Sequence, residues 1–182
     1  TRFENARSTK MVHIAEFTAD LLYHNKIKLD PGRNDHLKVT FHDSCNTSRA
    51  MGLLEEPRFI INKICHHFYE MPEETIREKT LCCGSGAGLN AGENLEVRLR
   101  GGFPRAQAVK YVKENHGVNV LANICALDRA SFPTLMDYWV PGVQVMGVHE
   151  LLGNALVMEG ECPRILDLRL EPLPEKGVTD DV

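Results

Sequence analysis

The sequence predicts an α/β domain with a mainly parallel sheet of βαβ units and short helices on the faces of the sheet. Short apolar, β-branched runs alternate along the chain with segments of helical periodicity, which is the pattern of βαβ units. The 182 residues are 43% hydrophobic and 25% charged, which suits a single globular domain with a substantial core.

The first half of the chain predicts two helices and two strands. Residues 7–25 carry apolar side chains at helical spacing, which indicates an amphipathic helix. Residues 37–41 alternate and are β-branched, so we expect a strand there. Residues 55–66 predict a helix with Pro57 in its first turn, and residues 67–71 suggest the next strand.

The second half predicts elements of the same two kinds. Residues 92–116 look helical, with a break at Gly101–Gly102 and an end at Gly117. Arg98, Arg100 and Arg105 flank this break, and a solvated helix face is the ordinary interpretation of them. The remaining predicted elements are a buried strand over 118–124, a helical piece interrupted by Pro133, a strand over 143–146 and a short helix containing Leu151 and Leu156.

Composition and charge exclude several classes of protein. The formal net charge is −4 and the basic residues are scattered, which argues against a nucleic-acid partner. No apolar run approaches the roughly 20 residues of a spanning helix, and no signal-peptide pattern opens the chain. We therefore expect a cytoplasmic domain that does not insert into a membrane. The start at Thr1, without a methionine, indicates a processed piece or a fragment.

We expect three segments. Residues 1–36 form an N-terminal helix and linker packed on the domain, residues 37–158 form a cysteine-rich domain, and residues 159–182 form a tail rich in proline and charge.

The chain contains more cysteines than packing requires, and no secretion signal favours disulfides, so metal binding or redox chemistry is the better explanation. Cys65 lies on the apolar face of the predicted helix over 55–66 and is expected to be a buried structural thiol. The six are Cys45, Cys65, Cys82, Cys83, Cys125 and Cys162.

Four of these thiols are expected at one edge of the sheet. Cys45 and Cys125 each follow a predicted strand, and ligands gather at the carboxyl ends of parallel strands. Cys82 and Cys83 run directly into a segment that contains Gly84, Gly86 and Gly88, where the backbone can come close to a bound group.

Several interpretations of the Cys82–Cys83 pair stay open on the residues alone. It can be a flexible loop with a vicinal disulfide, a structural zinc site, or part of a multi-iron cluster. A metal-free thiol–disulfide oxidoreductase that uses both thiols ranks last, because the pair lacks the C-x-x-C spacing of such enzymes. Adjacent cysteines bind one zinc ion only with strain, whereas a wider iron–sulfur cluster lets adjacent sulfurs reach different irons. The amides of Gly84 and Gly86 are expected to donate hydrogen bonds to such a cluster.

The pattern of Cys45, Cys82-Cys83-Gly84 and Cys125 resembles the cysteine-rich CCG domain of heterodisulfide reductase catalytic subunits, over roughly residues 37–155. Within that family the chain looks most like the carboxyl-terminal part of the K subunit (DsrK) of the membrane-bound Dsr complex. The stretches that carry this likeness are Phe41-His42-Asp43-Ser44-Cys45-Asn46, Met51 to Arg58 and Gly147 to Leu152.

The resemblance implies a 4Fe-4S cluster, which is non-cubane in the best-described relatives, bound by Cys45, Cys82, Cys83 and Cys125. It implies reductive cleavage, or formation, of a disulfide or trisulfide on a small DsrC-like sulfur-carrier protein in dissimilatory sulfur metabolism. Electrons would pass between a membrane haem-bearing subunit and this domain through ferredoxin-type clusters, whose C-x-x-C-x-x-C-x-x-x-C run this sequence lacks. The chain would then be the catalytic domain of a larger subunit, held at the inner face of the membrane by its complex.

The final cysteine of the family pattern is Asp128 in this chain. Asp128 can supply an oxygen ligand or leave one iron open to substrate sulfur, since a carboxylate is a harder ligand than a thiolate. His42 can protonate a leaving thiolate or simply end the strand. We assign both residues to the catalytic site, and keep as the alternative function a zinc- or disulfide-stabilised binding module without catalysis.

Overall fold

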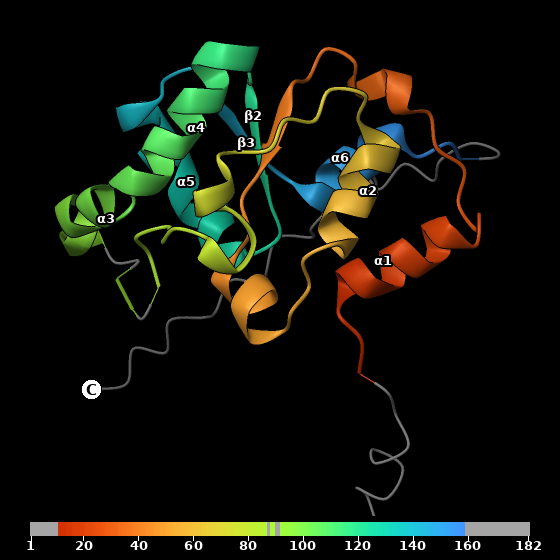
Figure 1. The fold of residues 1–182 in the computed structure, drawn as a ribbon, viewed down its shortest axis with the longest axis horizontal. Coiled ribbons are helices and arrows are strands. Elements are labelled where there is room, and N and C mark those ends of the chain that lie inside the picture. Colours follow the sequence, from red (N-terminus) through yellow and green to blue (C-terminus); the bar gives the residue numbers. More distant parts are fainter. Residues whose placement is uncertain (1–10, 87, 90–91, 159–182) are drawn as a thin grey trace, which may run out of the picture.

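A computed structural model describes residues 11–86, 88–89 and 92–158 of the chain. In these residues a three-stranded parallel sheet has the order β1-β2-β3, with β1 spanning Val39–Phe41, β2 Val120–Asn123 and β3 Gln144–Gly147. The predicted α/β fold with a parallel sheet is confirmed (Figure 1).

The central strand β2 contributes side chains to two hydrophobic cores. Val120 and Ala122 belong to one core, whereas Leu121 belongs to the other. This division follows from the alternation of side chains along a strand. All residues of β1 and β2 are buried, as expected for a parallel sheet with helices on both faces.

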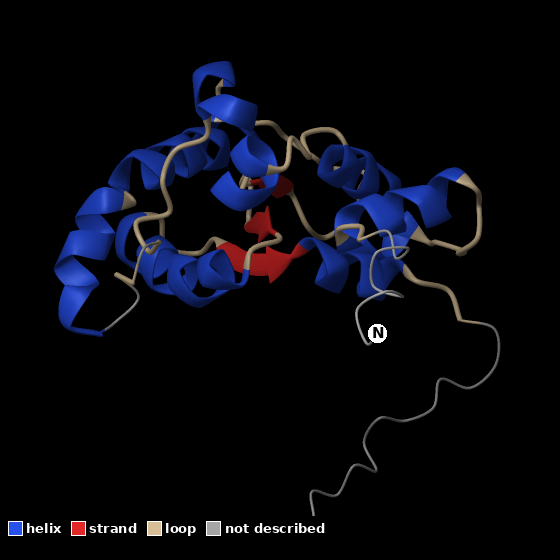
Figure 2. Ribbon diagram, turned by 90° about the horizontal axis from the view of Figure 1, so that it is seen from below, coloured by secondary structure: helices blue, strands red, loops and turns tan. Residues whose placement is uncertain are grey.

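The helices form two groups, one on each side of the sheet (Figures 1 and 2). The first core is covered by α1 (Ile14–Tyr23), α2 (Glu56–Ile64) and α6 (Val148–Ala155). The second core is covered by α4 (Phe103–His116) and α5 (Ala126–Trp139). A short α3 (Leu95–Gly101) leads directly into α4.

Local sequence explains where several helices begin and end. The His13 ring accepts a hydrogen bond from the amide of Ala15 (3.1 Å), and Glu16 accepts one from the amide of His13 (2.7 Å), so both groups cap α1. Pro104 lies in the first turn of α4, and Gly117 ends this helix at a positive φ of 70°. The predicted break at Gly101–Gly102 and the predicted end at Gly117 are both confirmed.

Two details of the predicted secondary structure are wrong. Residues 67–71 form only an isolated parallel bridge between Phe68 and Val39. After this one pair the chain turns at Pro72 into a short 3-10 helix over Glu73–Thr75, so the strand does not continue. Helix α5 continues through Pro133 instead of being interrupted there, and its packing against the core compensates for the lost backbone donor.

Some parts of the prediction fall outside the described residues or are not tested by the structure. Residues 7–10 of the first predicted helix and the tail over 159–182 lie outside the described residues, and the segment boundaries at 36 and 158 stay predictions. Among the described residues, no helix is both long enough and apolar enough to cross a bilayer.

Gly84 brings the cysteine loop into close contact with the junction of α3 and α4. Its φ is +83°, and a Cβ atom there would lie 2.3 Å from the carbonyl oxygen of Arg98 and 2.8 Å from the amide nitrogen of Gly102. A side chain at this position would overlap backbone atoms and would also require a left-handed backbone, so the position requires glycine. Gly86 has no positive φ, and a Cβ there would meet nothing within 4 Å.

We expect Gly84→Ala to lower the free energy of unfolding by roughly 2–4 kcal/mol, since the new methyl group overlaps backbone atoms and the backbone is left-handed. Gly86→Ala, the matched control in the same loop, should change it by less than about 0.5 kcal/mol. Urea unfolding followed by circular dichroism measures both. Equal effects of the two substitutions would contradict this account of the loop.

Candidate functional site

Three loops that carry cysteines meet at the carboxyl ends of β1 and β2. Cys45 lies four residues beyond β1, and Cys125 is the N-cap residue of α5, just after β2. The loop with Cys82 and Cys83 belongs to the segment between α2 and α3. The sequence-based placement of Cys45 and Cys125 just past strand ends agrees with these positions.

The carboxylate of Asp128 connects these three loops. Asp128 is in the first turn of α5 and is only 3% exposed. Its Oδ2 atom accepts a hydrogen bond from Ser44 Oγ (2.5 Å), and the Cys83 thiol is a further hydrogen-bond partner. Ser44 is next to Cys45, and Asp128 itself lies three residues after Cys125. The Asp128 side chain therefore connects the loops of Cys45, Cys83 and Cys125.

His42 lies against the same carboxylate. Its Nε2 atom is 3.5 Å from Asp128 Oδ2, and its ring packs edge-on against Phe132 with a centroid distance of 4.7 Å. The ring is 2% exposed, and its Nδ1 atom has no hydrogen-bond partner among the described residues. The structure thus brings together His42 and Asp128, the two residues that the sequence assigned to catalysis.

Burial dominates the acid–base properties of this pair. It lowers the pKa of His42 well below 6.5, and the charge of Arg105 lowers this pKa further. Burial raises the pKa of Asp128, while hydrogen bonds from Ser44 and Cys83 and the charge of Arg105 oppose that rise. His42 is therefore neutral in the folded protein at pH 7.

The four candidate thiols differ in their access to solvent. Cys45 and Cys82 are exposed, Cys83 and Cys125 are partly buried, and all four are free. Burial, with the nearby Asp128 and Cys82, raises the pKa of Cys83 to about 12, although a backbone hydrogen bond from Ser85 opposes the shift. A thiol in this setting gives up its proton when a cation or metal stabilises the thiolate.

The backbone at Gly84 supports the cysteine pair. Its amide donates a hydrogen bond to Cys82 Sγ with a nitrogen–sulfur distance of 3.3 Å. Such amide donors stabilise thiolate ligands and tune their electronic properties. A Cβ atom added at Gly86 or Gly88 would meet nothing within 4 Å among the described residues.

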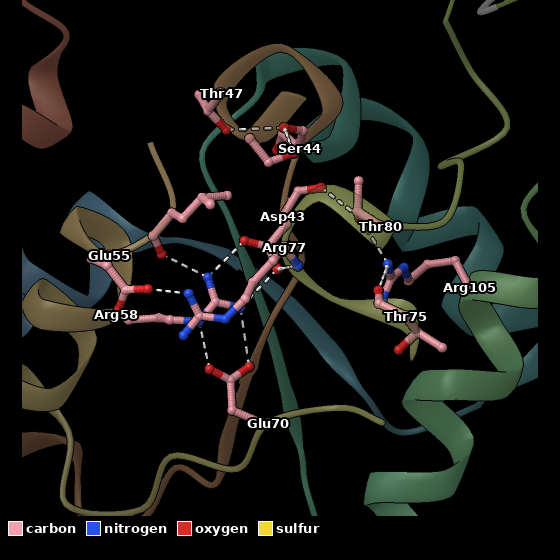
Figure 3. A network of polar contacts seen from close by, with 12 residues as sticks. Asp43, Ser44, Thr47, Glu55, Arg58, Glu70, Thr75, Arg77, Thr80 and Arg105 are labelled. Atoms are coloured by element: carbon pink, nitrogen blue, oxygen red, sulfur yellow. Dashed lines mark hydrogen bonds and ion pairs between the residues drawn. The ribbon is translucent and has the colours of Figure 1, made fainter. Parts of the chain in front are cut away.

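A buried ion pair fixes the position of the Cys45 loop. Both carboxylate oxygens of Asp43 accept hydrogen bonds from Arg58 of α2, at 2.7 and 2.8 Å (Figure 3). Arg58 also donates to Glu70 at 2.6 and 3.2 Å. Burial alone would lower the pKa of Arg58, but its hydrogen bonds to Asp43 and Glu70 outweigh that effect and raise it.

Asp43 also holds the segment that leads to the cysteine pair. Its Oδ2 atom accepts a hydrogen bond from the amide of Arg77 (2.7 Å), and its carbonyl oxygen accepts one from Thr80 Oγ1 (2.7 Å). Thr80 is two residues before Cys82, and Figure 3 shows these contacts converging on Asp43. The distance between the Cys45 loop and the Cys82–Cys83 loop is therefore set by Asp43 and its partners.

Sequence reasoning missed the roles of Arg58 and Arg105. The solvated helix face proposed for Arg105 is wrong, because its side chain is entirely buried. Helical spacing contained the signal: Arg105 shares a face with the buried Val109 and Val112, and Arg58 shares one with the buried Ile61. Cys65 is buried in the first core as predicted, and burial raises its pKa to about 11.

The donor set, four free thiols on three loops, has the chemistry of iron–sulfur ligands. The described residues contain no group of three or more His, Cys, Asp or Glu side chains close enough to hold one ion. A cluster of several irons is wider, so its ligands come from loops that surround it without converging on one point. The four thiols come from three loops, and the amide of Gly84 donates to one of them, which is the chemistry that such a cluster uses.

We expect the stability of the wild-type protein to fall more steeply than that of His42→Gln as the pH decreases from 7.5 to 5.5. The unfolded chain binds a proton at His42 below about pH 6.5, whereas the folded protein does so only at lower pH, so this stabilisation is complete at pH 7.5 and is lost on acidification. The extra loss is at most about 1.4 kcal/mol. Urea unfolding at several pH values measures it, and parallel pH profiles would contradict it.

Comparison with known proteins agrees with this site. Residues 39–127 match the family model of the CCG cysteine-rich domain, a span that includes Cys45, Cys82, Cys83 and Cys125. No solved structure matches the chain.

Several known proteins are similar to the chain. One is the Hdr-like menaquinol oxidoreductase iron-sulfur subunit of Archaeoglobus profundus, 48% identical over 169 residues, which are 91% of this chain and 30% of the relative. The Hdr-like menaquinol oxidoreductase iron-sulfur subunit 2 of Archaeoglobus fulgidus is 49% identical over 171 residues, 91% of this chain and 31% of the relative. A third relative belongs to the dihydromethanophenazine:CoB–CoM heterodisulfide reductase of Methanosarcina mazei and is 39% identical over 84 residues, 46% of this chain and 20% of the relative.

The chain thus spans less than a third of the length of these relatives. Their names agree with the predicted resemblance to heterodisulfide reductases, and the narrower likeness to the Dsr K subunit stays a prediction. With the family match covering the three cysteine loops, the chain carries a cysteine-rich domain of the CCG family.

Proposed function

We propose that this domain binds one 4Fe-4S cluster through Cys45, Cys82, Cys83 and Cys125 and forms the catalytic part of an iron–sulfur oxidoreductase of the heterodisulfide reductase type. The observation that supports this most directly is the junction at Asp128, where a single buried carboxylate links the loops of all four thiols. The presence of a CCG domain and the names of the relatives point to the same class.

The reaction that we propose is cleavage of a sulfur–sulfur bond. A disulfide takes up two electrons and two protons and gives two thiols, and the reverse reaction forms the bond and releases them. When bound, the cluster would supply one-electron transfer to substrate sulfur, with electrons from a haem-bearing membrane subunit and ferredoxin-type clusters elsewhere in the complex. The substrate that we propose is a disulfide or trisulfide on a small DsrC-like protein in sulfur metabolism.

The residues of this chain would control access and protons. Cys45 and Cys82 are exposed, so this side of the site is open to a protein-borne sulfur. Burial raises the pKa of Asp128, so its carboxyl group takes up a proton beside Cys83 more readily than an exposed aspartate does. The neutral imidazole of His42, next to Asp128, can accept or return that proton. The cytoplasmic side of the membrane is the location that we propose for this chemistry.

We expect protein reconstituted without oxygen to bind about four irons and four sulfides per chain, as a 4Fe-4S cluster requires. Cys83→Ser should lose most of that iron, because a hydroxyl group is a poor iron ligand. Cys65→Ala, whose side chain lies in the hydrophobic core, is the matched control and should retain it. Iron and sulfide analysis with EPR spectroscopy measures these outcomes.

Two results would reject the proposed function. If the wild-type protein binds no cluster, or if Cys83→Ser binds as much iron as Cys65→Ala, the ligand assignment fails. Zinc in stoichiometric amounts without sulfide, in protein purified without air, would instead support the alternative of a structural binding module.

A further inference from the structure

Arg105 is a buried cation without an anionic partner at contact distance in the part of the chain that the structure describes. Its side chain is 0% exposed, and it is the largest fully buried side chain among the described residues. Its guanidinium group donates to three neutral acceptors, Met71 Sδ (3.0 Å), the carbonyl oxygen of Thr75 (2.6 Å) and Thr80 Oγ1 (2.9 Å). Its Nε atom has no partner in the described part of the chain.

Arg58 provides a direct comparison within the same molecule. It is 4% exposed, and its guanidinium group is paired with two carboxylates, Asp43 and Glu70. Arg58 has a raised pKa, whereas burial lowers the pKa of Arg105 to about 10 despite the more distant charges of Asp43 and Asp128. A buried charge without a close counter-ion costs much free energy unless another negative charge compensates it.

The position of Arg105 indicates where that negative charge would be. Thr80 donates to the carbonyl oxygen of Asp43 and accepts a hydrogen bond from Arg105, so one hydroxyl group connects Arg105 with the Cys45 loop (Figure 3). Thr80 also lies two residues before Cys82. The charge of Arg105 acts on both His42 and Asp128 at the centre of the site. Arg105 therefore places a buried positive charge one hydrogen bond from Thr80, in the segment that leads to the cysteine pair.

We propose that Arg105 is the counter-charge of an anionic thiolate–cluster site, and that it stabilises the bound cluster and raises its reduction potential. This inference rests on the proposed function, because four thiolates around an iron–sulfur core supply the negative charge that the cluster-free protein lacks. One-electron reduction adds another negative charge, so a nearby fixed cation favours the reduced form. Arg105 acts on the cluster through its field and is not placed against substrate.

The test compares three variants with the wild-type protein. Arg105→Met removes the charge but keeps an apolar stem, and Arg105→Lys keeps the charge. Arg129→Met is the control, because Arg129 is a partly exposed cation of α5 that is already paired with Glu150. Midpoint potentials are measured by EPR-monitored redox titration, and iron retention is measured during incubation with a chelator.

We expect Arg105→Met to have a lower midpoint potential than the wild-type protein and to lose iron at least several times faster. Arg105→Lys should restore both properties toward the wild-type values, and Arg129→Met should leave both unchanged. A structural role alone would not give this dependence on charge. Unchanged potential in Arg105→Met, or an equal shift in Arg129→Met, would overturn the proposal.

Urea unfolding of cluster-free protein tests the charge imbalance separately from cluster binding. Because Arg105→Met also removes the hydrogen bonds to Met71, Thr75 and Thr80, this test compares Arg105→Gln, a neutral side chain that can still donate, with Arg105→Lys, which keeps the charge. In cluster-free protein Arg105→Gln should have a urea midpoint equal to or above that of Arg105→Lys, and a lower midpoint would mean that the charge is already compensated and would overturn the inference. Failure of the wild-type protein to bind iron and sulfide would reject the proposed function and, with it, the role of Arg105, whatever the urea result.

Discussion

The arrangement of the site depends on the buried ion pair between Asp43 and Arg58. Asp43 lies two residues beyond β1 and Arg58 belongs to α2, so the pair joins the end of a strand to the helix that covers it. The same aspartate holds the backbone at Arg77 and the hydroxyl group of Thr80. One aspartate therefore positions the loops on both sides of it. Because both partners are buried, loss of either would leave an unpaired charge inside the protein.

A second aspartate, Asp128 in the first turn of α5, connects the loops from the β2 side of the same sheet edge. Asp128 receives a hydrogen bond from Ser44, the residue after Asp43, and interacts with Cys83. The two aspartates have different electrostatic settings, because Asp43 is paired with an arginine, whereas no arginine or lysine among the described residues forms an ion pair with Asp128. Asp43 is thus a structural anchor, whereas burial makes Asp128 easier to protonate than an exposed aspartate.

Local patterns in the sequence were sufficient for most of the fold. Periodicity located the main helices and strands, and the strand ends correctly placed Cys45 and Cys125 at the same edge. The ion pair between Asp43 and Arg58 could not be predicted in this way, since nothing local identifies a charge partner on another element. Residues 67–71 were misjudged for the same reason: their apolar pattern fits a strand, but the number of ladder pairs depends on where the chain turns next.

The long separation of Ser44 and Asp128 along the chain has a consequence for maturation. They are 84 residues apart, and the loops that they join lie at the ends of paired strands. The loops come together only after β1 and β2 have paired, which makes this part of the fold slow to form relative to its helices. The site geometry therefore exists only in the folded protein, and a chain in which β1 and β2 had not yet paired would carry these thiols on separate, unconnected loops.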